Sequence, residues 1–190
     1  MKNRLPGHPI FTVLVLTGAA SCAPADADRT SRVHDAYLDI VAAEDARPSS
    51  GPALRLLIAH TASDNRFLRT AAIRALGRLE NPDVAGEIES ALTDPAPEVR
   101  GEAANALAQA YFGADGHAAL VPLLERASVE HDASVRGVVA ASIGRLALDS
   151  AGVERAAETL MEMSYAHGQD APGEVMEGVA LGLDALSRST

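Results

Sequence analysis

The chain has 190 residues and a formal net charge of −10. That length suffices for one ordinary domain, and the 47% of apolar residues can fill an extended core. Aromatic residues make up only 3% of the chain and Trp is absent, so Ala, Leu, Val and Ile must form the core, which favours closely packed helices. The acidic balance argues against nucleic acid and anionic lipid surfaces as partners, because both bind clustered cations.

The first 21 residues have the features of an export signal. Lys2 and Arg4 precede a short apolar run from Ile10 to Leu16, and small residues lead from there into Cys22. The apolar run is too short to span a bilayer. We therefore assign residues 1–21 to a signal peptide and leave them out of the fold.

Cys22 is the single cysteine of the chain, so no disulfide can form within it. The stretch Ala19-Ala20-Ser21-Cys22 resembles the lipobox of bacterial lipoproteins, in which the cysteine thiol receives a diacylglyceryl group. That family prefers Leu or Val where Ala19 stands, and the alternative is an ordinary signal peptide with Cys22 incidental. The resemblance implies a lipid anchor at Cys22 in the cell envelope. Ala23 favours the periplasmic side of the outer membrane, if the cell has one.

Three stretches of eleven residues repeat one helical pattern. They begin at Arg69, Arg100 and Arg136, and small or branched apolar residues follow three, four, seven and ten positions after each arginine. This spacing places the apolar residues on one face of an α-helix. A weaker copy begins at Met176 without the arginine, as expected of the last repeat in a stack.

Amphipathic stretches lie between these copies and supply a first helix for each repeat, at residues 52–60, 82–92, 117–127 and 153–165. Pro122 is expected to kink the third of these first helices. Residues 30–46 form one more helix, which would cover the amino-terminal end of the stack. We therefore predict an all-α fold over residues 30–188, an α-solenoid of about four helical hairpins with an amino-terminal capping helix. Residues 22–29 would be the acylated cysteine and a flexible tether.

The hairpins resemble HEAT repeats, particularly the short bacterial kind related to phycobilisome-lyase repeats. The resemblance rests on a turn Asp followed by VR-x-x-A-x-x-A-L, which is best matched from Asp94 to Leu107 and next best from Asp132 to Arg136. It covers roughly Gly51 to Ser187. The copies start at intervals of 31, 36 and 40 residues, of which the first two are shorter than the ~40 to 47 of longer HEAT units. The resemblance implies a scaffold that binds proteins.

An arginine stands at the start of three predicted second helices, beside the buried stripe. We predict that its guanidinium binds the turn aspartate and loop carbonyls of its own or the adjacent repeat, in a ladder that fixes the register of the stack. Direct ligand binding by these arginines is the alternative. The residues of this structural ladder are Asp64, Arg69, Asp94, Arg100, Asp132 and Arg136.

A stack of hairpins leaves one row of second helices on a common concave face. The outward positions of these helices carry cations and amides with no acid, and the small residues among them are expected to leave a groove. An acidic segment of a partner would complement such a face, although ordinary solvated positions would have the same composition. The predicted partner-binding residues are Arg74, Arg78, Asn105, Gln109 and Arg145.

The sequence lacks common motifs of catalysis and metal binding. It has no His-Glu dipeptide, no two His four residues apart, no G-x-S-x-G and no P-loop. We therefore expect no enzymatic activity, no metal and no cofactor. The favoured function is a membrane-tethered scaffold that binds another envelope protein or a peptide. The alternative is an envelope small-ligand-binding protein or lyase-like enzyme with a pocket near His34, Asp39 and His60.

Overall fold

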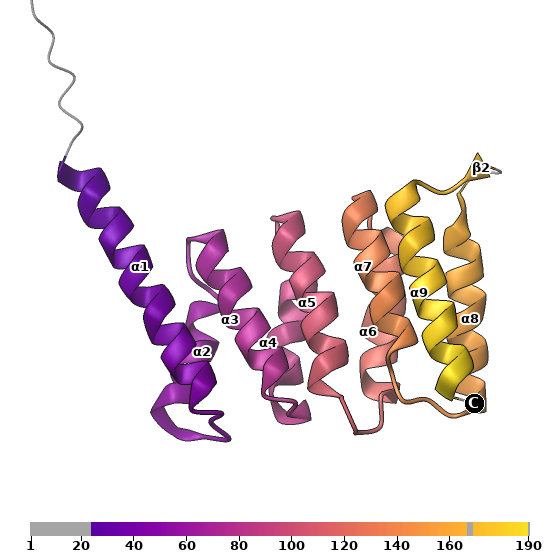
Figure 1. The fold of residues 1–190 in the computed structure, drawn as a ribbon, viewed down its shortest axis with the longest axis horizontal. Coiled ribbons are helices and arrows are strands. Elements are labelled where there is room, and N and C mark those ends of the chain that lie inside the picture. The colour runs from indigo at the N-terminus through magenta and orange to yellow at the C-terminus, as the bar shows by residue number, and fades with distance from the viewer. Residues whose placement is uncertain (1–23, 167–168, 190) are drawn as a thin grey trace, which may run out of the picture.

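A computed structural model describes residues 24–166 and 169–189. Four helical hairpins follow one another along the long axis of the molecule, and helix α1 (Pro24–Asp45) covers the first end (Figure 1). The predicted all-α solenoid is therefore confirmed. The hairpins pair α2 (Gly51–His60) with α3 (Arg66–Arg78), α4 (Ala85–Ser90) with α5 (Pro97–Ala110), α6 (His117–Val129) with α7 (Ala133–Gly144), and α8 (Ser150–Ser164) with α9 (Gly173–Ser189).

The first helix of the second hairpin is shorter than predicted. Helix α4 has six residues and lies between two 3-10 helices, η1 (Pro82–Val84) and η2 (Ala91–Thr93). Pro82 has no N–H and Gly86 is a weak helix former, which limits the α-helical part. In the third hairpin, helix α6 continues without interruption through Pro122. The last hairpin is joined by a pair of two-residue antiparallel strands, β1 (Tyr165–Ala166) and β2 (Gln169–Asp170).

The second helices share one starting point. Each begins three residues before the repeated arginine, or before Met176 in α9. Asn65 and Asp132 cap α3 and α7, because their side-chain oxygens accept hydrogen bonds from the N–H groups of Phe67 (2.9 Å) and Val135 (3.0 Å). The repeated arginine therefore lies one turn inside its helix, next to the turn that precedes it.

The core is a continuous row of small and branched side chains between the first and second helices. In the first three copies of the pattern, every predicted stripe residue except Leu79 is at most 2% exposed. In the fourth copy, Val179 and Leu186 are 3% exposed, but Ala180 is exposed. Helix α9 is the last helix of the described chain, so no further described helix covers its outer flank.

Small residues on the second helices bring neighbouring backbones together. A Cβ atom on Gly77 would lie 2.7 Å from the Cα atom of Ala106 on α5, and one on Gly144 would overlap the backbone of Gly182 on α9. A hollow of about 330 Å³ remains between α5 and α7, lined in part by Gly101, but the expected groove is closed at Gly77 and Gly144. A helix without a side chain at these positions allows its neighbour to approach and fill the space.

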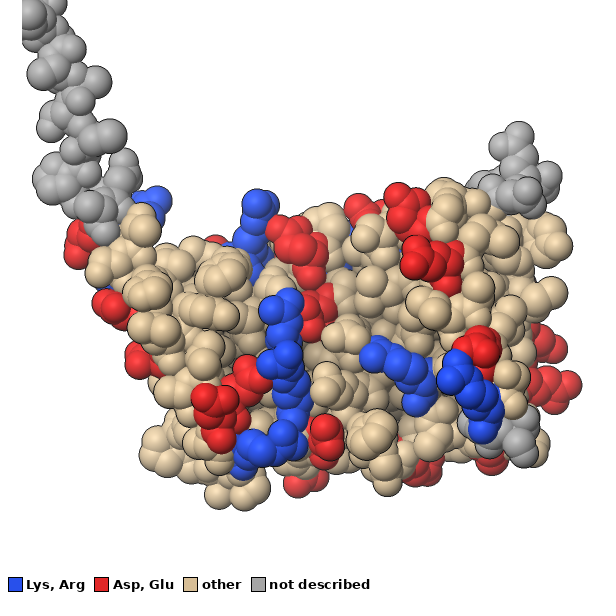
Figure 2. Space-filling view, viewed as in Figure 1, with Lys and Arg blue, Asp and Glu red and all other residues tan. Residues whose placement is uncertain are grey.

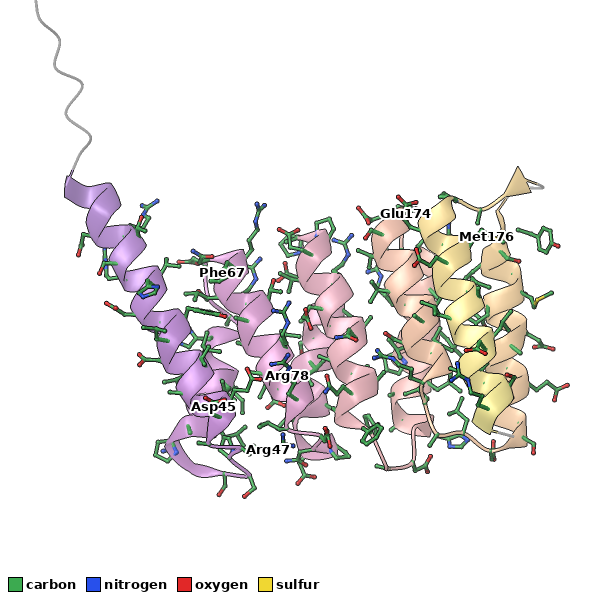
Figure 3. All side chains as sticks on the ribbon, in the orientation of Figure 1. Asp45, Arg47, Phe67, Arg78, Glu174 and Met176 are labelled. Atoms are coloured by element: carbon green, nitrogen blue, oxygen red, sulfur yellow. The ribbon has the colours of Figure 1, made fainter. Side chains whose placement is uncertain are left out.

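Helix α1 begins earlier than predicted. It starts at Pro24 rather than near Thr30, so residues 24–29 of the expected tether are helical. A proline in the first turn of a helix loses no hydrogen bond, and alanine is the best helix former. The cap contacts the first repeat through the rings of Tyr37 and Phe67, whose centroids are 5.1 Å apart (Figure 3). None of the described helices is long and apolar enough to cross a membrane, and Cys22 lies outside the described residues.

Candidate functional site: the second-helix face and its arginine ladder

The first arginine of the ladder bridges two repeats. Nε and Nη2 of Arg69 donate hydrogen bonds to Oδ2 (2.7 Å) and Oδ1 (2.9 Å) of Asp94, which lies in the turn before α5. Nη1 donates to the backbone oxygens of Ser63 (2.8 Å) and Asp64 (3.3 Å) in the turn of its own repeat. The side chains of Arg69 and Asp94 are only 14% and 10% exposed. A bidentate pair in such a place holds two successive turns in register.

The second arginine binds a different acid from the one expected. Nε and Nη2 of Arg100 donate to Oε2 and Oε1 of Glu130, both at 2.8 Å, and Nη1 donates to the backbone oxygen of Asp94 (3.0 Å). Asp132, the predicted partner, instead caps α7. Glu130 lies three residues before α7, just as Asp94 lies three residues before α5. This shared position is the signal that could have identified Glu130 in the sequence.

Glu130 joins three helices through one buried carboxylate. Its side chain is 1% exposed, it accepts hydrogen bonds from the N–H groups of His131 and Asp132 (both 2.9 Å), and Nε of Arg126 lies 3.3 Å from its Oε2 atom. Burial alone would raise the pKa of Glu130. The hydrogen bonds from Arg100 and the Asp132 N–H, with the charges of Arg126 and Arg100, outweigh burial and lower this pKa to about 2.

The third arginine, Arg136, adds no further pair to the ladder: within the described residues its guanidinium makes no hydrogen bond or ion pair. The carboxylate of Asp64 is not part of the ladder either, because Arg69 binds the backbone oxygen of Asp64 and not its side chain. The position three residues before α9 is Asp170, whose side chain lies outside the described set. The described ladder therefore consists of Arg69–Asp94 and Arg100–Glu130.

The exposed surface formed by α3, α5, α7 and α9, which we call the second-helix face, carries acids as well as cations (Figure 2). Arg74 binds Glu102 of α5, and Arg78 binds Glu44 of α1, each with one N–O distance of 2.7 Å. The expectation of a face without acids is therefore wrong. Glu44 comes from the capping helix, and Glu102 lies next to the outward positions that define the face. The arginine side chains remain 48% and 55% exposed.

Arg145 has neutral partners within the described chain. Its Nη2 atom donates to Oδ1 of Asn105 (2.8 Å) and Oγ of Ser142 (3.1 Å), and burial lowers its pKa. Asn105 in turn donates from Nδ2 to Oε1 of Glu102 (3.2 Å), which also binds Arg74. Three of the five predicted partner-binding residues, Arg74, Asn105 and Arg145, thus belong to one hydrogen-bonded network across α3, α5 and the end of α7.

The remaining two predicted residues, Arg78 and Gln109, do not belong to this network. They line a polar cavity of about 300 Å³, where Figure 3 shows Asp45, Arg47 and Arg78 gathered at the ends of α1 and α3. The predicted set therefore divides into a network of three residues and a separate pair. The other lining residues of the cavity are Glu44 and Glu80.

The pocket expected near His34, Asp39 and His60 has a different lining. A cavity of about 590 Å³ lies between α1 and the turn before α3, but none of these three residues lines it. Across residues 24–166 and 169–189, no group of three or more His, Cys, Asp and Glu side chains is placed to hold a metal ion. The lining residues are Arg29, Arg32, Val33, Ser63, Asp64, Asn65 and Leu68.

His117 forms a separate polar cluster that joins two turns. Its Nδ1 atom lies 2.5 Å from Oδ1 of Asp115, and its Nε2 atom lies 3.0 Å from Oδ1 of Asp149. These two hydrogen bonds raise the pKa of His117. Both ring nitrogens are occupied, so the cluster holds the turns before α6 and α8 together.

The architecture is that of an α-solenoid. Residues 52–144, which span the first three hairpins from α2 to α7, match the family model described as HEAT repeats. The α8–α9 hairpin continues the same arrangement. HEAT repeats generally mediate protein–protein interactions and are typically non-enzymatic scaffolds. No curated protein matches the sequence of the chain.

Proposed function

We propose that the protein is a membrane-tethered interaction module of the bacterial cell envelope, which binds an acidic segment of another envelope protein or peptide through its second-helix face. The row of second helices carries this proposal, because it presents one continuous surface that spans successive repeats (Figures 1 and 2). Contacts to several repeats at once give affinity without a deep pocket.

Arg145 is the centre of the proposed contact. Its described partners are an amide and a hydroxyl group, so its charge is available to a carboxylate of the partner. Arg74 and Arg78 are held by Glu102 and Glu44, whose side chains are only 11% and 20% exposed, but the two arginine side chains are about half exposed. A partner carboxylate would therefore bind the exposed side of each guanidinium and leave its pair with Glu102 or Glu44 in place.

Reversal of the three charges tests this contact. The variant Arg74→Glu, Arg78→Glu, Arg145→Glu should bind its partner at least about tenfold more weakly, because like charges then face each other. Crosslinking in intact cells followed by mass spectrometry identifies the partner, and titration with that purified partner gives the affinity. The matched control reverses three exposed arginines elsewhere, Arg29, Arg55 and Arg155. Unchanged partners in the first variant, or an equal loss in both, would contradict the proposed face.

The proposed tether is tested at Cys22. Each buried CH₂ group contributes roughly 0.8 kcal/mol, so two or three acyl chains hold a protein on a membrane where one would exchange. We expect Cys22→Ala to abolish labelling by an alkyne analogue of palmitate and to release the protein from the membrane fraction. Equal labelling of Cys22→Ala and the unaltered protein would exclude acylation at this residue. Separation of inner and outer membranes then tests the expected outer-membrane location.

A further inference from the structure

A groove lies on the side of the first helices, between the second and third hairpins. In Figure 1 these first helices lie behind the second helices. The groove has a volume of about 620 Å³ and runs between α4 with η2 on one side and α6 on the other. Leu92, which is 4% exposed, lies in its floor with Pro122, and Val129 is 55% exposed at its edge. Leu92 is thus almost covered, and Pro122 and Val129 supply the accessible apolar surface of the groove.

The floor of the groove is tied to the arginine ladder. Nη1 of Arg126 donates a hydrogen bond to the backbone oxygen of Leu92 (3.2 Å), and Nε of the same arginine lies 3.3 Å from Oε2 of Glu130. The guanidinium thus connects η2, α6 and the turn before α7, and it shares the carboxylate of Glu130 with Arg100. The hydrogen bond from Arg126 to Leu92 therefore joins the two walls of the groove.

Two carboxylates stand on opposite walls of the groove, Glu89 on α4 and Glu125 on α6. Both are exposed, and neither makes a hydrogen bond or ion pair with any residue in the described ranges. The hydroxyl groups beside them donate to their own helices, Ser90 to the backbone oxygen of Gly86 (2.9 Å) and Ser128 to that of Glu125 (2.8 Å). The exposed charges of the groove are therefore both negative, and the one cation among its lining residues, Arg126, is only 14% exposed.

We propose that this groove docks a cationic amphipathic segment of another protein. An apolar side chain of the segment would cover Leu92, Pro122 and Val129, and a Lys or Arg on each side of it would pair with Glu89 and Glu125. Charge complementarity identifies the occupant, because two free carboxylates flank an apolar floor in a chain whose net charge is −10. The groove is separate from the second-helix face, so this proposal is independent of the acidic partner proposed there.

Filling the groove without changing its charge is the first test. A Cβ atom on Gly86 would meet no other atom within 4 Å, so Gly86→Leu places a side chain in the groove without disturbing the fold. The probe is a synthetic amphipathic peptide of Lys and Leu, titrated by fluorescence anisotropy at about 0.15 M salt, where long-range charge effects are screened. We expect Gly86→Leu to bind at least tenfold more weakly, and Ala180→Leu, at an exposed site on α9, to bind as the unaltered protein does.

Removing the two charges is the second test. The variant Glu89→Gln, Glu125→Gln should bind the peptide about tenfold more weakly, whereas Glu158→Gln, Glu177→Gln, which loses the same charge on α8 and α9, should bind it normally. Equal losses in the two variants would show that the peptide follows the net charge, and unchanged binding by Gly86→Leu would show that it lies elsewhere. Either result overturns the proposal. A peptide with Glu in place of Lys should not bind.

Discussion

Arg100→Ala is expected to lower the free energy of unfolding by about 3 kcal/mol, because it leaves the carboxylate of Glu130 buried without its bidentate partner. For a chain of this size, such a loss lowers the melting temperature by roughly 10 °C. Thermal unfolding followed by circular dichroism measures it. The melting temperature should change far more than the affinity for any partner, since Arg100 is 14% exposed and its hydrogen bonds are internal.

Two controls separate the buried pair from ordinary surface charge. Arg78→Ala removes a pair whose arginine is 55% exposed, so it should change the stability by less than about 1 kcal/mol. The triple variant Arg100→Met, Arg126→Met, Glu130→Met should regain part of the loss, because it leaves no unpaired buried charge in this cluster. An Arg100→Ala protein that melts normally but loses its partner would show instead that Arg100 binds a ligand.

The Arg100–Glu130 pair also makes stability depend on pH. The pKa of Glu130 is about 2 in the folded chain, whereas an unperturbed glutamate, as in the unfolded chain, has a pKa of 4.5. The stabilisation by ionised Glu130 is therefore complete above pH 4.5 and disappears as the pH falls towards 2. A difference of this size corresponds to about 3 kcal/mol. Urea unfolding of the unaltered protein and of Glu130→Gln between pH 2 and 6 should show this part of the acid dependence in the unaltered protein alone.

The repeat architecture could be predicted from sequence because its signals lie within short stretches of the chain. The period of Ala72, Ile73 and Leu76, repeated in the next two copies, defines each second helix, and these side chains are indeed buried. Caps such as Asn65 act within three residues of the helix they begin. Neither signal depends on how one hairpin sits on the next, so both can be interpreted without a structure.

The chemistry of the faces could not be predicted because it depends on contacts between repeats. Glu102 and Glu44 come from neighbouring helices 28 and 34 residues away from the arginines that they bind. Glu130 was missed because the aspartate two residues later fits the family pattern better. The free carboxylates of Glu89 and Glu125 likewise come from two different hairpins and meet in one groove only when these hairpins stack.

Gly178→Ala is expected to destabilise the last hairpin by at least about 2 kcal/mol, although alanine normally stabilises a helix by 0.5–1 kcal/mol relative to glycine. A Cβ atom at Gly178 would overlap backbone atoms of Gly137 on α7, and no rotamer of either residue can relieve a contact between backbones. Helix α9 must then move away from α7, and faster hydrogen exchange of the α9 amides would report this. Gly86→Ala, in open space on α4, is the matched control and should be stabilising. If Gly178→Ala stabilised the protein as Gly86→Ala does, α7 and α9 would not be in contact, and the fourth hairpin would not be stacked on the third.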